Sequence, residues 1–163
     1  MKICVAFGED ASSFSAEVMI RRVAWDCAYT IKSFHFDELD GSPRGSAAAR
    51  RVSSTDILIM ALRNDRSLPS HVRLWMGLCL GMRDREKEGA LVALMIQTGE
   101  SNDFDASLVE YLETVAIIGG MKFFLKRQTQ EQAGRTPRNL SEAGLGGERR
   151  TMDSRARLEV STS

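Results

Sequence analysis

Three apolar stretches decide the fold of this chain: ICVAF (Ile3–Phe7), DILIMAL (Asp56–Leu62) and ALVALMI (Ala90–Ile96). Read as strands, they are apolar on both faces, so both faces must be covered. A parallel sheet between two layers of helices is the arrangement that covers such strands. The segments between them are long enough to hold helices. The sequence therefore predicts an α/β fold with these three segments as its central strands.

Two further segments are predicted as strands at the edges of the same sheet. Thr30–Phe36 is interrupted by Lys32 and His35, and Met121–Leu125 is interrupted by Lys122. Polar breaks of this kind are typical of edge strands. With right-handed crossovers, the pattern predicts a three-layer sandwich around a five-stranded parallel sheet in the order 2-1-3-4-5.

Helical patterns fill the segments between the predicted strands. We expect one helix from Ser12 or Ser13 to Trp25, a short one ending near Ser53, one from Ser70 to about Lys87, and one from Phe104 to Ile118. The hydroxyl of Ser12 or Ser13 would cap the first helix. From Arg127 onward arginine and glycine replace aliphatic residues. We therefore expect an α/β domain over residues 1–126 and a polar, poorly ordered tail over residues 127–163.

Composition narrows the classes of function. Lys+Arg and Asp+Glu both number 22, so the net charge is zero and no nucleic-acid partner is expected. No apolar run approaches the roughly 20 residues that span a bilayer, so no membrane partner is expected either. The N-terminal MKICVAFGED turns acidic at once, unlike a signal peptide, which favours a cytoplasmic location. Cys4, Cys27 and Cys79 are predicted to be buried, reduced thiols.

A ligand site is expected beyond the C-terminal ends of the strands, near the point where the strand order reverses. The loops 8–13, 63–68 and 97–101 should meet there. Lys126, after the fifth predicted strand, is expected on the same rim. The reactive side chains of the three loops are Glu9, Asp10, Ser12, Ser13, Asn64, Asp65, Arg66, Thr98 and Glu100.

This set of residues resembles the receiver domain of bacterial response regulators. Asp65-Arg66-Ser67-Leu68-Pro69 is similar to the D-x-x-[LM]-P run of that family, and the approach of Gly120–Leu125 to a lysine is similar to its last strand. Hard cations prefer oxygen ligands, and phosphoryl transfer needs charge neutralisation. The resemblance implies Mg²⁺ ligands at Glu9 and Asp10, a phosphoacceptor at Asp65, and phosphoryl contacts at Thr98 and Lys126.

Longer stretches resemble a loosely defined set of small, uncharacterised bacterial α/β proteins. The likeness covers about residues 2–126 and implies the fold and a bacterial source, but no activity. The matching stretches are SFHFDELD (Ser33–Asp40), SSTDILIMALRNDRSLPSHVRLWM (Ser53–Met76), GALVALM (Gly89–Met95) and GGMKFF (Gly119–Phe124).

The strand order is also that of flavodoxin-like proteins and flavin reductases. These proteins hold the phosphate of FMN on hydroxyl and backbone N–H groups at the helix N-terminus after the first strand. Ser12 and Ser13 are the matching cofactor-binding candidates here. Pro69 and Ser70 also resemble the loop after the third strand of flavin reductases. FMN binding therefore stands as an alternative.

The helix predicted from Ser70 is apolar almost all round. Leu74, Trp75, Leu78 and Met82 leave more apolar surface than one sheet face covers, which predicts a homodimer or another protein partner. The function predicted first is a non-catalytic, receiver-like signalling or protein-interaction module of bacterial type that needs no cofactor. An Mg²⁺-dependent phosphoacceptor domain and a flavodoxin-like, FMN-binding reductase are the alternatives.

Overall fold

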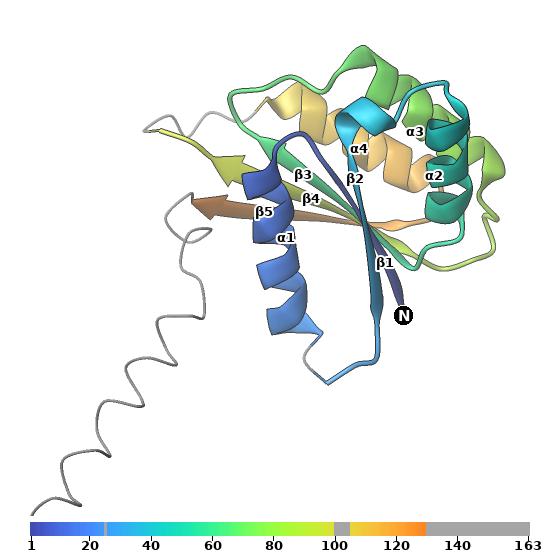
Figure 1. Ribbon diagram of the computed structural model, residues 1–163, viewed down its shortest axis with the longest axis horizontal. Coiled ribbons are helices and arrows are strands. Elements are labelled where there is room, and N and C mark those ends of the chain that lie inside the picture. Colours follow the sequence, from blue (N-terminus) through green and yellow to red (C-terminus); the bar gives the residue numbers. More distant parts are fainter. Residues whose placement is uncertain (25, 100–104, 130–163) are drawn as a thin grey trace, which may run out of the picture. The chain divides into compact units, whose positions relative to one another are not determined.

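A computed structural model describes residues 1–24, 26–99 and 105–129 of the chain (Figure 1). Their strands form one parallel sheet in the order β2-β1-β3-β4-β5. The strands are β1 (Lys2–Phe7), β2 (Thr30–His35), β3 (Ile57–Arg63), β4 (Ala90–Gln97) and β5 (Lys122–Thr129). The predicted fold class, the strand order and the two edge strands are confirmed.

Helices cover both faces of this sheet. They are α1 (Asp10–Val23), the 3-10 helix η1 (Phe36–Glu38), α2 (Pro43–Ser53), α3 (Ser70–Met82) and α4 (Ala106–Ile118). Figure 1 shows α1 on one side of the sheet and α2, α3 and α4 together on the other. None of the described helices is long and apolar enough to cross a membrane.

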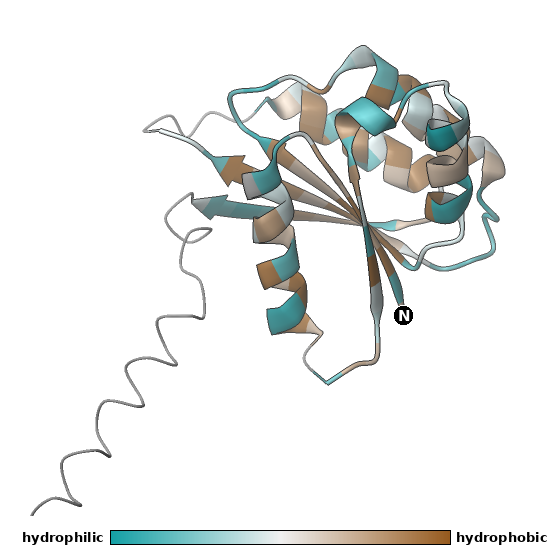
Figure 2. Ribbon diagram, in the orientation of Figure 1, coloured by the Kyte–Doolittle hydropathy of each residue, from teal (hydrophilic) through white to brown (hydrophobic). Residues whose placement is uncertain are grey.

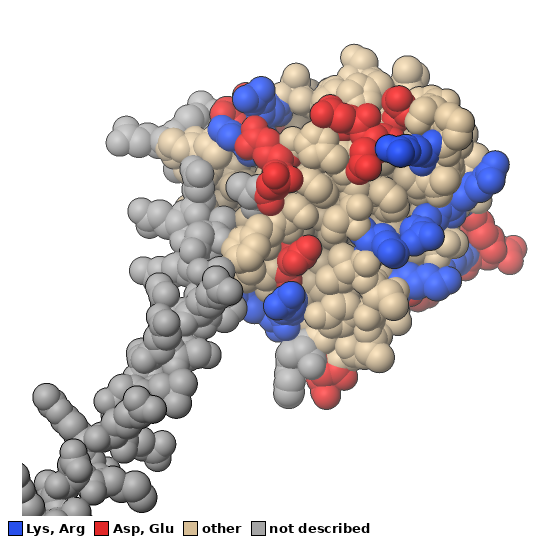
Figure 3. All heavy atoms as spheres, viewed as in Figure 1, with Lys and Arg blue, Asp and Glu red and all other residues tan. Residues whose placement is uncertain are grey.

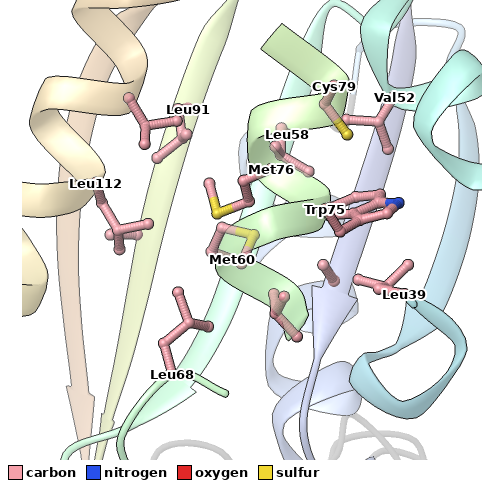
Figure 4. Packing of buried hydrophobic residues seen from close by; sticks show 14 of the residues in the cluster. Leu39, Val52, Leu58, Met60, Leu68, Trp75, Met76, Cys79, Leu91 and Leu112 are labelled. Carbon is pink, nitrogen blue, oxygen red and sulfur yellow. The ribbon is translucent and has the colours of Figure 1, made fainter. Parts of the chain in front are cut away.

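The core consists of two apolar clusters, one on each side of the sheet. Alternate residues of β1 enter opposite clusters: Cys4 packs on the side of α2 and α3, and Val5 packs on the side of α1. Figure 4 shows how Trp75 and Met76 of α3 pack in the larger cluster with Met60 of β3. Figure 2 shows apolar residues along β1, β3 and β4, whereas the end of β5 is hydrophilic. This pattern is why β5 tolerates an edge position.

Several predicted boundaries are wrong. Helix α1 begins at Asp10 with Glu9 at its N-cap, so neither Ser12 nor Ser13 caps it, and both backbone N–H groups donate to the carbonyl oxygen of Glu9. Helix α3 ends at Met82 instead of near Lys87 because the backbone turns extended at the next residue. Strand β5 continues to Thr129 and so takes the first three residues of the predicted tail.

Other predictions fall outside the part of the chain that the structure describes. They include the contributions of Trp25 and Phe104 to their helices, the rim position of Glu100, and the tail from residue 130 onward. Of the three cysteines, Cys4 and Cys79 are buried as predicted, but Cys27 is exposed, which corrects the expectation for that residue. Burial raises the pKa of the Cys79 thiol to about 12, so this thiol is unreactive at neutral pH.

A buried arginine joins the turns at the N-terminal end of the sheet. Arg83 is 7% exposed and follows α3 directly. Its guanidinium donates to the carbonyl oxygens of Gly119 at 3.1 Å, Thr55 at 3.1 Å, Ser53 at 3.3 Å and Lys87 at 3.3 Å. One side chain therefore ties the ends of α2 and α4 to the loops that lead into β3 and β4.

Candidate functional site

A pocket of about 170 Å³ lies at the C-terminal ends of β1 and β3, where the strand order reverses. This is the rim at which the strand order predicts a site. The side chains that line it come from the loop after β1, the end of β2 and the loop after β3. The polar ones used below are Glu9, Ser12, His35, Arg63 and Arg66.

Arg63 is the centre of an ion-pair cluster at this rim. Its Nη1 donates to Oε2 of Glu9 at 2.6 Å, and its Nε and Nη2 donate to the two carboxylate oxygens of Asp65 at 2.9 and 2.6 Å. Arg66 stands 3.8 Å from the other oxygen of Glu9, with 71% of its side chain exposed. A planar guanidinium binds carboxylates by two parallel bonds in this way, so Arg63 holds both acids in place.

These contacts change the acidity of the groups. The bonds from Arg63 hold the pKa of Asp65 below its usual range. The same bonds to Asp65 and Glu9 raise the pKa of Arg63 further above neutral pH. Because a carboxylate next to a guanidinium is stabilised in its charged form, Asp65 is an anion that already has its counter-ion.

This arrangement bears on the predicted phosphoacceptor. Asp65 would have to give up two charge-assisted hydrogen bonds before it could attack a phosphoryl group. Glu9, a predicted Mg²⁺ ligand, is likewise engaged by Arg63, and Asp10 is exposed as the first residue of α1. Among the described residues there is no group of three or more His, Cys, Asp or Glu side chains placed to hold a metal ion. The rim therefore presents neutralised acids in place of an open carboxylate cluster.

The two predicted phosphoryl-contact residues lie apart from each other. The backbone N–H and the hydroxyl of Thr98 both donate to Oδ1 of Asn64 at 2.9 Å, which fixes the loop after β4 to the loop after β3. Lys126 lies inside β5, paired in register with Leu94. Thr98 comes four residues after Leu94, one residue past the end of β4, which is roughly 13 Å at 3.3 Å per residue. The expectation that Lys126 follows the last strand at the rim is wrong, because β5 continues past it.

The two predicted cofactor-binding serines differ in their surroundings. Ser12 is 2% exposed and lines the pocket, whereas Ser13 is half-buried and does not line it. The backbone N–H of Ser12 donates to the carbonyl oxygen of Glu9 at 2.9 Å, which holds this residue in the first turn of α1. A serine hydroxyl can both donate and accept, so Ser12 is the one of the two serines that a ligand in the pocket could contact.

A histidine that the sequence reasoning treated only as an edge-strand residue completes the pocket wall. The Nε2–H of His35 donates to the carbonyl oxygen of Gly8 at 2.9 Å, and its Nδ1 accepts from the backbone N–H of Asp37 at 3.2 Å. The His35 ring also packs edge-on against Phe7. The spacing of His35 and Glu38 was the sequence signal that could have predicted this role. The Glu38 carboxylate accepts from the backbone N–H of His35, as in a capping box.

The predicted interface residues separate into two groups. Trp75 is 2% exposed and its indole N–H donates to the carbonyl oxygen of Gly45 at 2.9 Å, so it belongs to the core and its assignment to an interface is corrected. The other three lie on the outer face of α3: Leu74 is 77% exposed, Leu78 38% and Met82 41%. On the neighbouring α4, Ile117 and Ile118 are exposed as well. We call these five exposed side chains the α3–α4 face.

Comparison with known proteins identifies solved structures of similar fold. No model of a known protein family matches the chain, and no curated protein does. The flavodoxin of Megasphaera elsdenii is 13% identical, with a TM-score of 0.56 over 84% of this chain and 91% of that one. A Streptococcus pneumoniae flavodoxin is 13% identical, with a TM-score of 0.55 over 90% of this chain and 99% of that one.

The Trp repressor binding protein of Bacillus subtilis is also similar, with 15% identity and a TM-score of 0.54 over 90% of this chain and 98% of that one. Likenesses at this level of identity show the fold alone. The chain therefore has a flavodoxin-like α/β fold, as the predicted resemblance to flavodoxin-like proteins implies. The receiver-domain resemblance and the bacterial source stay predictions.

Proposed function

We propose that this protein is a non-catalytic interaction module of flavodoxin-like fold that forms a homodimer through the α3–α4 face. The observation that carries the proposal is the exposure of large apolar side chains on two neighbouring helices, α3 and α4. Leu74 and Ile117 have 77% and 71% of their surface in water although they sit on neighbouring helices. Large apolar side chains exposed on adjoining elements of a folded domain are candidates for an interaction site.

Two glycines on the same face support close approach by another helix. Gly77 and Gly81 lie inside α3 and are exposed, and the space where their side chains would be is open. Glycine inside a helix costs about 1 kcal/mol relative to alanine, and no contact with the described residues requires it here. A helix of a partner crossing at these positions would use the absence of side chains.

The charges around the face favour a second copy of the chain as the partner. Arg73 at the start of α3 lies 5.0 Å from the ring centroid of Tyr111, while Glu110 and Glu113 are exposed on α4. A two-fold interface brings one surface against itself, so it needs both signs of charge at its border. With a net charge of zero over the whole chain, two copies do not repel each other at long range.

Sedimentation velocity over a range of concentrations tests this proposal. Wild-type protein is expected to dimerise, and the double variant Leu74→Glu/Ile117→Glu to be monomeric, with at least a hundredfold weaker dimer because four carboxylates would be buried without partners. Val23→Glu is the matched control: Val23 is 79% exposed but lies at the end of α1 on the opposite layer. Circular dichroism checks that each variant is folded.

Two results contradict the proposed dimer. One is wild-type protein that stays monomeric at 100 μM or above, on the order of the weakest specific contacts. The other is dimerisation that survives in the double variant or is lost equally in Val23→Glu.

Binding of FMN at the rim is a second candidate function. The flavodoxin-like fold and the position of Ser12, which lines the pocket near the N-terminus of α1, favour a phosphate group there. The pocket is small for the whole cofactor. Its volume of about 170 Å³ is below the roughly 300 Å³ of the smallest typical ligand pockets. Glu9 at the N-cap also opposes a phosphate, although Arg63 neutralises its charge. The residues thus fit a phosphate group better than they fit the flavin ring.

A titration of FMN with the protein, followed by flavin fluorescence, tests this candidate. We expect Ser12→Ala to weaken binding about tenfold, because one hydrogen bond to a charged group contributes about 1.5 kcal/mol. The neighbouring Ser13→Ala, which does not touch the pocket, should leave binding unchanged. The candidate fails if wild-type protein leaves flavin fluorescence unaltered, or if both substitutions have the same effect.

A further inference from the structure

A second groove lies at the opposite end of the sheet from the rim. It has a volume of about 570 Å³ and runs between the N-terminal halves of β1 and β2 and the C-terminal half of α2. Four of its lining side chains are cationic: Lys2, Lys32, Arg50 and Arg51. Figure 3 shows Lys and Arg side chains gathered on this side of the molecule, over and below α2. We call this feature the basic groove.

The four cations reach the groove from three separate elements. Lys32 pairs in register with Cys4, so its side chain projects from the same sheet face, the one that α2 covers. Lys2 begins β1, two residues before Cys4 and therefore on that face too. Arg50 and Arg51 belong to the last turn of α2. Their convergence is a property of the tertiary structure, because 48 residues or more separate the arginines from Lys2 in a chain numbered from Met1.

These charges have no acidic counterpart in the groove. No Asp or Glu lines it, and none of the four cations forms an ion pair with a carboxylate of the described residues. Asp56 is the neighbouring acid, since it accepts from the backbone N–H of Lys2 at 2.7 Å. Its carboxylate is already paired with Lys87 at 3.1 Å. Four like charges around one hollow repel each other, so an anion bound between them would be stabilised.

A structural role accounts for only part of this arrangement. Basic residues in the last turn of a helix interact favourably with its dipole, and Arg50 and Arg51 do so in α2. Arg21 and Arg22 likewise belong to the last turn of α1. Only the pair in α2, however, faces a groove to which two strands add lysines. The pair in α1 therefore separates the dipole effect from ligand binding.

We propose that the basic groove binds a compact polyanion that carries two or more phosphate groups. Guanidinium groups bind phosphate oxygens through paired hydrogen bonds, and lysines add charge at the ends of the site. The groove volume lies within the roughly 300–1,000 Å³ of small-molecule sites. None of the described residues that line the groove is aromatic, so they offer no surface on which a nucleic-acid base would stack. A ligand without a base, such as a short polyphosphate or a bisphosphorylated sugar, has the matching chemistry.

Isothermal titration calorimetry with sodium tripolyphosphate, without divalent cations, tests this inference. Wild-type protein is expected to bind one equivalent, and the affinity should fall when salt is raised from 50 to 200 mM because counterions compete with the ligand. Arg50→Gln/Arg51→Gln should weaken binding at least tenfold. Arg21→Gln/Arg22→Gln, which removes the same charge from an equivalent helix end, should change it by less than twofold. Lys32→Gln, on β2, supplies a second test if the α2 variant does not fold.

Several results would overturn the proposal. They are the absence of tripolyphosphate binding to wild-type protein, equal losses in the two arginine pairs, and unchanged binding in both Arg50→Gln/Arg51→Gln and Lys32→Gln. Tighter binding of a single-stranded oligonucleotide than of tripolyphosphate would assign the groove to nucleic acid instead. None of these results depends on the dimer, since the α3–α4 face contains none of the four cations.

Discussion

Replacing Arg83 by methionine should destabilise the protein by about 2–4 kcal/mol. The side chain is 7% exposed, and two of its four acceptors, the carbonyl oxygens of Gly119 and Thr55, lie in buried hydrogen bonds. A buried acceptor left without a partner costs about 1–3 kcal/mol. The carbonyl oxygens of Ser53 and Lys87 are only partly buried, so water can replace the guanidinium there.

The opposing contribution is the desolvation of the charge itself. Burial lowers the pKa of Arg83, which means that the folded protein disfavours its charged form. Removing the guanidinium relieves this cost and brings the estimate down from the roughly 2–6 kcal/mol of two orphaned carbonyls. Arg83→Lys should recover only part of the loss, because a single ammonium group cannot reach four carbonyl oxygens as the planar fork does.

Urea unfolding followed by circular dichroism measures the effect as a change in midpoint at constant slope. Arg85→Met is the matched control, because Arg85 is exposed two residues further along the chain and should change stability by less than about 0.5 kcal/mol. The reasoning is refuted if Arg83→Met costs less than about 1 kcal/mol, if it equals Arg85→Met, or if Arg83→Lys restores full stability.

Three further predictions concern the face, the rim and the core. Gly77→Ala should stabilise the isolated fold by about 0.5–1 kcal/mol in urea unfolding while weakening the dimer in sedimentation; stabilisation of both would argue against a close helix crossing. The pKa of Asp65 is lowered by Arg63, so its contribution to stability is present above the unfolded value near 3.9 and is lost as the pH falls through the folded value. In Arg63→Met, an NMR titration should show this pKa raised toward 3.9, and an unchanged titration would refute the ion pair. Trp75→Phe should cost about 1–3 kcal/mol in thermal or urea unfolding by orphaning the buried carbonyl oxygen of Gly45, and a neutral result would contradict that bond.

The fold could be predicted from the sequence because short stretches of the chain carry the signals that specify it. Strands such as Ile57–Arg63 and Ala90–Gln97 are apolar on both faces, which happens in few places other than a parallel sheet covered on both sides. Lysines within β2 and β5 interrupt their apolar pattern, which predicted that these two strands lie at the edges of the sheet. The helix boundaries were less accessible: α3 ends early because Arg83 turns inward to carbonyl oxygens contributed by distant segments.

At the rim, the sequence pattern predicted which loops meet but not which side chains bind each other. That Glu9 and Asp65 would lie near each other followed from the strand order, and they do. That Arg63 would bind Glu9 as well as Asp65, which is only two residues away, depended on side-chain geometry across 54 residues of sequence. Likewise, Trp75 and Leu74 are neighbours in one apolar helix, yet only packing against α2 and the sheet assigns the first to the core and the second to solvent.

Alternation and helical periodicity along the chain were enough to specify the layers, the strand order and the end of the sheet where loops meet, because burying apolar faces leaves few other solutions. The pairing of charges depended on the folded molecule: which acids are neutralised at the rim, and which cations surround the basic groove without a carboxylate partner among the described residues. Ion pairs and grooves depend on distances of a few ångströms between segments that are far apart in the chain. These distances are fixed only when the helices and strands pack, so they cannot be read from the order of residues.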